Sequence, residues 1–177
     1  LGGEVMRKLG VNAVLMPATE IFQAMQSGAI DAAEWVGPLL DQAFGLQRIT
    51  SLCYTPAFAE PTAGLEIVFN LDAWNELPDD LKAICEGAAN QAAMETLGQF
   101  DYFNALAMAQ LEEAGVEFLA FPDDVVEAMR EAWNEVREET RTASADAARV
   151  LESIEAFEAK SFPYTRAFTQ RYLEGRG

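Results

Sequence analysis

The stretch that offers the clearest chemistry joins a carboxylate to an aromatic residue. Glu34 and Trp35 follow the mostly apolar run 28–33, and a Gly-Pro pair ends the stretch. A helix-forming run at 18–27 precedes it, so the order of helix, glycine, apolar run, carboxylate and breaker predicts a strand that ends at a ligand-facing edge. Because carboxylates are rarely buried without a partner, Glu34 is predicted to meet a cation or a substrate hydroxyl. The alternative is a structural carboxylate that is salt-bridged or solvated.

The composition argues against several other kinds of chemistry. The chain has no histidine, and its two cysteines, Cys53 and Cys85, lack CxxC spacing, so we expect no zinc site and two ordinary buried thiols. It has no Gly-x-Ser-x-Gly or glycine-rich phosphate-binding motif, so we do not expect an enzyme. The net charge of −17, from 29 acidic and 12 basic residues, argues against nucleic acid and anionic membranes as partners. A small carboxylate would approach such a chain only where local positive charge or a bound cation overrides the overall field.

The first 70 residues have the pattern of a β-α-β unit with a parallel sheet. The expected elements are, in order, a helix at 3–10, a strand at 12–16, a helix at 18–27 and a strand at 29–36, followed by extended segments at 48–58 and 64–69.

After residue 70 the pattern becomes mainly helical. The expected elements are a helix at 71–77, a long helix from 78 to about 114, a strand at 116–121 and a helix from 123 to 159. At about 1.5 Å per residue the last helix would be roughly 55 Å long, whereas a compact domain of this size is about 40 Å across. This helix must therefore kink, project, or cross something larger than one domain. Pro163 is expected to end it, and the aromatic tail at 161–177 is expected to pack on a partner.

Several short motifs in a fixed order resemble one known family. They are LGGEVMRKLG at 1–10, MP at 16–17, EIFQA at 20–24, the stretch from Gly28 to Pro38, and Tyr54 through Pro61. Their order and spacing resemble the solute-binding proteins of tripartite ATP-independent periplasmic (TRAP) transporters, the DctP family, in the branch that binds 2-oxo or 2-hydroxy carboxylates. The likeness extends from Leu1 to about Phe168. Family members have two lobes, and the chain resembles the C-terminal half of one.

The resemblance implies an α/β fold in two parts. Residues 1–70 would form a periplasmic-binding-protein-like, ligand-binding lobe with a small mixed sheet and hinge-crossing strands, and residues 71–177 would form long C-terminal helices that span both lobes and form a homodimer. It also implies a periplasmic protein that delivers a small organic acid to TRAP membrane permease subunits. The alternative is a helical interaction or dimerisation module that binds no ligand.

The resemblance further implies a binding site. The residue matching Glu34 supplies a carboxylate oxygen to a sodium or calcium ion, the residue matching Trp35 supplies its main-chain carbonyl, and the ion bridges both to the two oxygens of a 2-oxo acid. The residue matching Glu60 points into the cleft as a further metal or substrate contact, and Phe58 matches an aromatic pocket wall. The Trp35 ring is either a pocket wall or part of the core. For Glu60 and Phe58 the alternatives are an exposed loop acid and a core aromatic.

One feature of the family is absent from this sequence. The family holds its ligand carboxylate with a bidentate arginine, whose planar fork suits that geometry. That arginine belongs to a motif just upstream of Leu1, and no arginine of this chain occupies a matching position. We therefore expect the 177-residue chain alone to bind a carboxylate such as pyruvate weakly or undetectably, which calorimetry with sodium or calcium would test.

Overall fold

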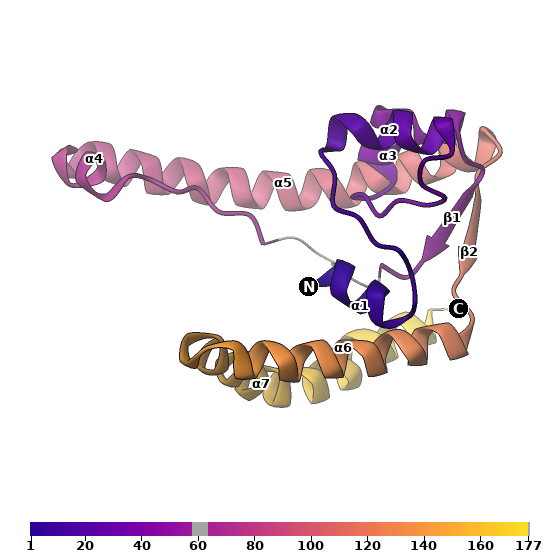
Figure 1. Cartoon of the computed structure of the whole chain (residues 1–177). Coiled ribbons are helices and arrows are strands. Elements are labelled where there is room, and N and C mark those ends of the chain that lie inside the picture. The colour runs from indigo at the N-terminus through magenta and orange to yellow at the C-terminus, as the bar shows by residue number, and fades with distance from the viewer. Residues whose placement is uncertain (58–63, 177) are drawn as a thin grey trace. The chain divides into compact units, whose positions relative to one another are not determined.

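The structure is a computed structural model that describes residues 1–57 and 64–176. Its internal contacts divide the chain into two units (Figure 1). The terminal unit consists of Leu1–Val14 with Asp123–Gly177, and the central unit is Leu15–Pro122. The domain boundary expected after residue 70 falls inside the central unit, so that division of the chain stays a prediction.

The central unit combines helices with one small sheet. Its elements are α2 (Ala18–Ser27), α3 (Pro38–Phe44), the short helix η1 (Leu46–Arg48), β1 (Leu52–Thr55), α4 (Leu71–Glu76), α5 (Asp79–Glu113) and β2 (Glu117–Ala120). The two strands are parallel, with Leu52 opposite Glu117 and Thr55 opposite Ala120. Helix α3 packs along α5. The small sheet and the long helices that the sequence predicted are confirmed, with α5 between the two strands and a parallel pair in place of the expected mixed sheet.

The prediction of a β-α-β unit in the first 36 residues is wrong. Residues 12–16 and 29–36 carry no strand, and β1 and β2 are the two strands within the described residues. An apolar run becomes a strand only when a second strand accepts and donates its backbone hydrogen bonds. Neither segment has such a neighbour in the part of the chain that the structure describes. Glu34 therefore lies in an irregular segment that leads into α3 rather than at the end of a strand.

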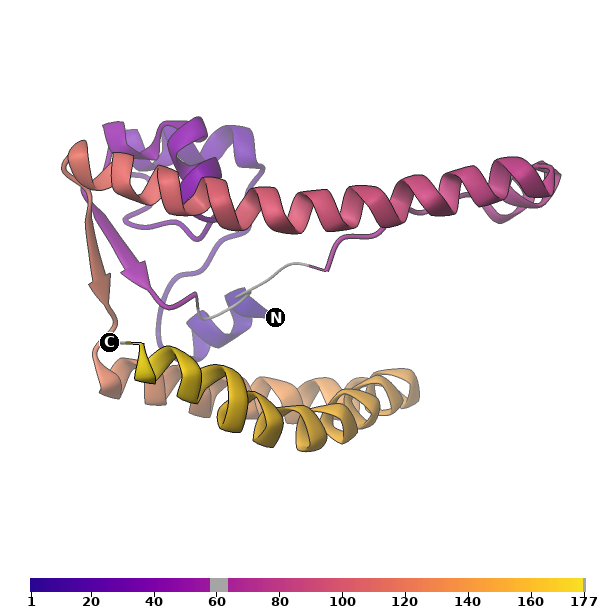
Figure 2. The same cartoon turned by 180° about the vertical axis from the view of Figure 1, so that it is seen from behind.

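Helix α5 begins and ends where its local signals predicted. Pro78 precedes it, Asp79 and Asp80 occupy its first turn, and Gly115, with φ at +92°, follows its end. Its buried residues, Ala107 and Leu111, belong to the C-terminal part. The N-terminal part, which leads back to α4 (Figure 2), carries exposed apolar side chains, among them Ile84, Met94 and Leu97.

The terminal unit is helical. It contains α1 (Gly2–Lys8), α6 (Asp123–Ala143), α7 (Ala145–Thr165), the π-helical turn η2 (Arg166–Gln170) and α8 (Arg171–Gly175). Val5 of α1 packs against Ala132 and Val136 of α6, with Leu9 beside them. Lys8 adds ion pairs to Glu135 at 3.0 Å and Glu139 at 2.7 Å. These contacts hold α1 on the surface of α6.

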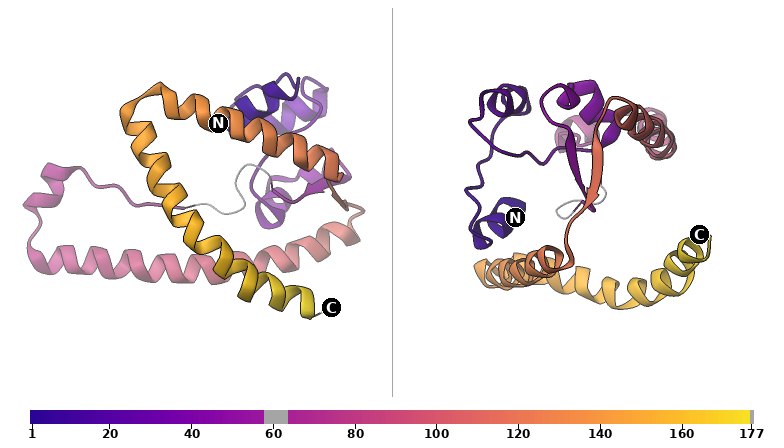
Figure 3. Two further views of the ribbon diagram at one scale, coloured as in Figure 1. Left: turned by 90° about the horizontal axis from the view of Figure 1, so that it is seen from below. Right: turned by 90° about the vertical axis from the view of Figure 1, so that its right-hand side faces the viewer.

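The long helix expected from 123 to 159 is interrupted at Ser144, so that α6 and α7 meet at an angle (Figure 3). Ser144 is extended, with φ −161° and ψ 158°, and its hydroxyl accepts a hydrogen bond from the Ala147 N–H at 3.0 Å. A serine in this position caps the first turn of a new helix. The prediction that the helix ends at Pro163 is wrong, because α7 continues through Pro163 to Thr165. Proline removes one N–H from the helix, but its φ suits helical geometry, and the π-helical turn η2 follows.

None of the helices in the described part of the chain is long and apolar enough to span a membrane.

Candidate functional site

The candidate site begins where α2 ends. Gly28 adopts the left-handed conformation, with φ at +73°, and its N–H donates to the Met25 carbonyl at 3.1 Å. The next amide, of Ala29, donates to the Ala24 carbonyl at 2.8 Å. Glycine adopts positive φ at little cost, so it stops the helix here and redirects the chain. The segment that follows carries Glu34, which is exposed to solvent, and Trp35.

A carboxylate of α3 holds the turn that follows Trp35. The Gly37 N–H donates to Asp41 Oδ1 at 3.1 Å. Burial raises the pKa of Asp41, while the neighbouring backbone N–H groups, that of Gly37 first, oppose that rise. A partly buried carboxylate thus holds the Gly37 amide, two residues after Trp35.

Polar side chains of α5 fix α3 in place. Asn104 Oδ1 accepts from the Leu39 N–H at 2.9 Å, a contact between residues 65 positions apart. Because the first N–H groups of a helix have no partner within it, Asn104 supplies the acceptor that the start of α3 lacks. One turn further on, Gln42 Nε2 donates to Gln110 Oε1 at 2.9 Å. The start of α3, and the turn attached to it, is therefore anchored to the longest helix of the central unit.

The Trp35 ring packs on the same helix. Its centroid lies 5.2 Å from that of Phe44 with the rings tilted by 30°, and the residue is half-buried. Its Nε1–H is buried and has no hydrogen-bond acceptor among the described residues. The ring thus contacts α3 as a packing residue, while the role predicted for the Trp35 carbonyl stays a prediction.

The other site residues predicted from the sequence cannot be placed. Glu60 and Phe58 lie outside the described residues. Over residues 1–57 and 64–176, no three acidic, cysteine or histidine side chains come close enough together to hold a metal ion. A cation at Glu34 would therefore take its other oxygens from backbone carbonyls, from residues outside this part of the chain, from water, or from the ligand itself.

The central unit offers little positive charge. Its basic residues are Arg48 and Lys82, and Lys82 lies 3.9 Å from Asp79. The two cysteines are free thiols, as expected, but they are half-buried rather than buried. Burial, followed by the negative charge of Asp41, raises the pKa of the Cys53 thiol, so it stays protonated near neutral pH.

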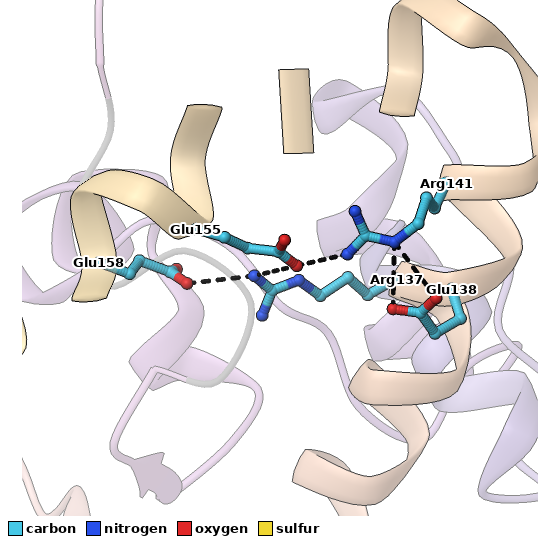
Figure 4. A network of polar contacts seen from close by, with 5 residues as sticks. All are labelled: Arg137, Glu138, Arg141, Glu155 and Glu158. Carbon is cyan, nitrogen blue, oxygen red and sulfur yellow. Dashed lines mark hydrogen bonds and ion pairs between the residues drawn. The ribbon is translucent and has the colours of Figure 1, made fainter. Parts of the chain in front are cut away.

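The arginines at the junction of α6 and α7 are engaged with glutamates. Arg137 contacts Glu155 at 2.7 Å and Glu158 at 3.2 Å, and Arg141 contacts both Glu155 and Glu138 (Figure 4). The hydrogen bond from Arg141 lowers the pKa of Glu155. This network ties α6 to α7 and leaves these guanidinium groups committed to the protein's own carboxylates.

Two hollows in the structure have neither Glu34 nor Trp35 among their lining residues. One, of about 410 Å³, lies in the terminal unit between α6 and α7 and is lined by apolar side chains such as Trp133, Val150 and Ile154. The other, of about 290 Å³, lies in the central unit among Ile67, Phe69 and neighbouring side chains. Arg137, Asp146 and Glu158 also line the first hollow, where Arg137 is paired with Glu158, and Glu86 lines the second.

Known proteins match the chain along most of its length. A family model described as bacterial extracellular solute-binding protein, family 7, matches residues 1–143. A monocarboxylate 2-oxoacid-binding periplasmic protein of a Nostoc species is 36% identical over 166 residues, covering 94% of this chain and 46% of the relative. The chain thus spans about half the length of this curated relative.

Solved structures agree in fold. A TRAP periplasmic solute-binding protein from Colwellia psychrerythraea, crystallised with calcium and pyruvate, superposes with a TM-score of 0.92 at 32% identity, over 98% of this chain and 53% of that one. One from Pseudoalteromonas atlantica, with sodium and pyruvate, gives 0.90 at 32% identity and the same coverage of 98% and 53%. The chain belongs to family 7 of the bacterial extracellular solute-binding proteins.

Proposed function

We propose that this chain is part of the periplasmic solute-binding subunit of a TRAP transporter, and that it binds a small 2-oxo or 2-hydroxy carboxylate through a sodium or calcium ion. The subunit would then deliver the ligand to the membrane permease. No catalytic role is proposed. The observation that carries the proposal is the Glu34-Trp35 pair, an exposed carboxylate beside a main-chain carbonyl, directly before a turn that Asp41 holds.

The chemistry of the donor groups fits a hard cation. Sodium and calcium prefer carboxylate, carbonyl and water oxygens, and Glu34 and Trp35 offer the first two kinds. A 2-oxo acid adds one carboxylate oxygen and one keto oxygen to the same ion. Glu60 would be a further oxygen donor and Phe58 a pocket wall, as the family resemblance implies. Because the central unit contains only Arg48 and Lys82 as basic residues, a cation is the simplest means by which it attracts an anion.

Substitution of Glu34 in the intact gene product tests the proposal. Calorimetry with pyruvate, with and without calcium or sodium, is expected to show cation-dependent binding that Glu34→Gln abolishes. Asp31→Asn is the matched control, since it removes one negative charge from the same exposed segment. Binding to Glu34→Gln with unchanged affinity and unchanged cation dependence would refute the proposal.

A helical interaction module is the second candidate, and the exposed side chains of the C-terminal helices favour it. Phe157 is 70% exposed, Phe168 64% and Leu173 62%, which is high for large apolar residues. We propose that this surface forms a homodimer in the receptor. Sedimentation and calorimetry of the natural protein and of Glu34→Gln separate the two candidates. A dimer that binds pyruvate in its natural form and loses that binding in Glu34→Gln supports a receptor that also dimerises. A dimer that binds no pyruvate in either form leaves the interaction module as the better description.

A further inference from the structure

An apolar stretch of chain without regular structure precedes α4 in the central unit. Residues 64–69 have the sequence GLEIVF, belong to no helix or strand, and are called the apolar segment. Leu65 is 80% exposed and Val68 83%, which is high for large apolar side chains. Within residues 1–57 and 64–176, no backbone hydrogen bond joins the apolar segment to another residue. Its side chains and its backbone groups are therefore largely open to solvent.

One face of the apolar segment lies against α5. The segment runs beside the N-terminal part of that helix (Figure 2), and Leu65, Ile67 and Phe69 line the hollow of about 290 Å³ together with side chains of α5. The Phe69 ring also packs on Trp74 of α4, with the ring centroids 4.8 Å apart. Alternate side chains of an extended chain point to the same face, and its backbone groups point sideways to two edges. A helix thus covers one face of the segment, while both edges stay open.

The composition of the apolar segment is typical of a strand that has a neighbour on each side. Strands at the edge of a sheet are commonly protected by charged residues or proline, but this segment carries one charge, that of Glu66, and no proline. Flexible linkers are rich in glycine, serine or charge, whereas four of these six residues are large and apolar. A nearly continuous apolar run indicates a strand that is buried on both faces within a sheet.

We propose that the apolar segment is a central strand of a sheet whose neighbouring strands belong to the part of the intact gene product that this chain does not include. About half the length of the curated relative has no counterpart in this chain, which is ample for two strands. A second copy of the chain is a poorer partner, because pairing about a twofold axis covers one edge of the segment and leaves the other open.

This inference goes beyond the proposed function, since it depends on neither the cation nor the carboxylate ligand. It also gives the apolar segment a role in the receptor. Glu60, a proposed ligand contact, precedes the segment by four residues in the sequence. A strand paired on both edges would join the chain that carries Glu60 to the rest of the receptor.

Amide hydrogen exchange of the intact gene product tests the pairing. In an extended chain the N–H groups of Glu66 and Val68 point to one edge, and those of Ile67 and Phe69 point to the other. We expect all four amides to exchange at least about a hundredfold more slowly than in the unfolded chain. Protection of one pair alone would mean a single neighbouring strand, and exchange at the unfolded rate would mean a hydrated linker. Either result would overturn the proposal.

A photo-cross-linker on the other face of the segment identifies the partner. Val68→benzoylphenylalanine places a reactive group where the natural side chain is exposed, and the group forms a bond to C–H groups of whatever covers it. We expect the linked peptide to lie outside these 177 residues. Asp79→benzoylphenylalanine is the control, because the Asp79 side chain is fully exposed at the start of α5, and it is expected to give no such product.

The other outcomes of the cross-linking experiment count against the proposal. A bond to a residue of these 177, a bond to a second copy, no product, or equal yields from positions 68 and 79 would each overturn it. Glu66→benzoylphenylalanine replaces the first variant if that does not fold, since residues 66 and 68 share one face of an extended chain. Because neither measurement uses a ligand, failure of this inference leaves the proposed function standing, and loss of pyruvate binding does not affect it.

Discussion

Removal of the Asn104 side chain tests how the start of α3 is held. Asn104→Ala deletes the acceptor for the Leu39 N–H, whose hydrogen bond is 2.9 Å long and partly buried. Gln110→Ala deletes a hydrogen bond of the same length, 2.9 Å, between the same two helices, but that bond is exposed. The two variants therefore differ mainly in the burial of the group that loses its partner.

Burial decides the expected magnitude. A partly buried N–H that loses its acceptor costs about 1–2 kcal/mol, whereas an exposed amide finds water and the change stays within about 0.5 kcal/mol. A cost of 1–2 kcal/mol corresponds to about a 5- to 30-fold increase in the population of the open state. Alanine also has a higher helix propensity than asparagine or glutamine, so both substitutions stabilise α5 by a few tenths of a kcal/mol. A measurement of global unfolding would mix these opposing effects.

Amide hydrogen exchange of residues 37–44 measures the effect on α3 directly. We expect exchange of this segment, and of the Leu39 amide above all, to accelerate about 5- to 30-fold in Asn104→Ala and by no more than about twofold in Gln110→Ala. The acceleration should be confined to α3 and the turn before it. Equal exchange rates in the two variants would show that Asn104 does not hold the start of α3, and that the turn after Trp35 is fixed by other contacts.

Two further predictions concern the terminal unit. Val136 is 2% exposed in the small core between α1 and α6, so Val136→Ala should lower the free energy of unfolding by about 2 kcal/mol in urea titrations. Val150 is 55% exposed, so Val150→Ala should change the free energy of unfolding by no more than about 0.5 kcal/mol. Equal losses of unfolding free energy in the two variants would mean that this core contributes little to stability. Glu155 has a pKa below its ordinary value of 4.5, chiefly because Arg141 donates a hydrogen bond to it. The contribution of Glu155 to stability is therefore fully present above pH 4.5, and it is lost as the pH falls through the lower pKa of the folded state. Glu155→Gln should therefore lower the melting temperature at pH 7 and flatten its decline in acid; an unchanged acid limb would argue against this ion-pair network.

The helices could be predicted from the sequence because their boundaries depend on neighbouring residues. Asn70 caps α4 by accepting from the Ala73 N–H at 3.1 Å, and the Pro-Asp-Asp motif at 78–80 opens α5. The break between α6 and α7 was missed because the apolar pattern continues across it. Ser144, with Asp146 in the turn that follows, was the local signal that would have located it.

The strands were predicted only in part: β1 and β2 lie within the segments expected at 48–58 and 116–121, whereas the strands expected at 12–16 and 29–36 did not form. A strand depends on a partner that can lie far away in the sequence. The run at 29–36 has the composition of a buried strand, yet it pairs with no other segment among the described residues. Strand β1 pairs with β2, which lies more than 60 residues further along the chain. The same limit applies to the site. Glu34 and Trp35 stand out in the sequence, but nothing near them indicates that Asn104 holds the helix on which their turn depends.

The charge of the chain, which at first argues against an anion as ligand, is consistent with the proposed mechanism. The arginines at the α6–α7 junction are paired with glutamates, and the central unit has only Arg48 and Lys82 to offer an anion. In the proposed site, the Glu34 carboxylate and the Trp35 carbonyl would provide the negative charge and the dipole that attract a cation. Under the proposed function, a bound calcium or sodium ion would reverse the local field and become the positive group that a 2-oxo acid meets. A net charge of −17 then favours binding of the ion, and the ion makes binding of the acid possible.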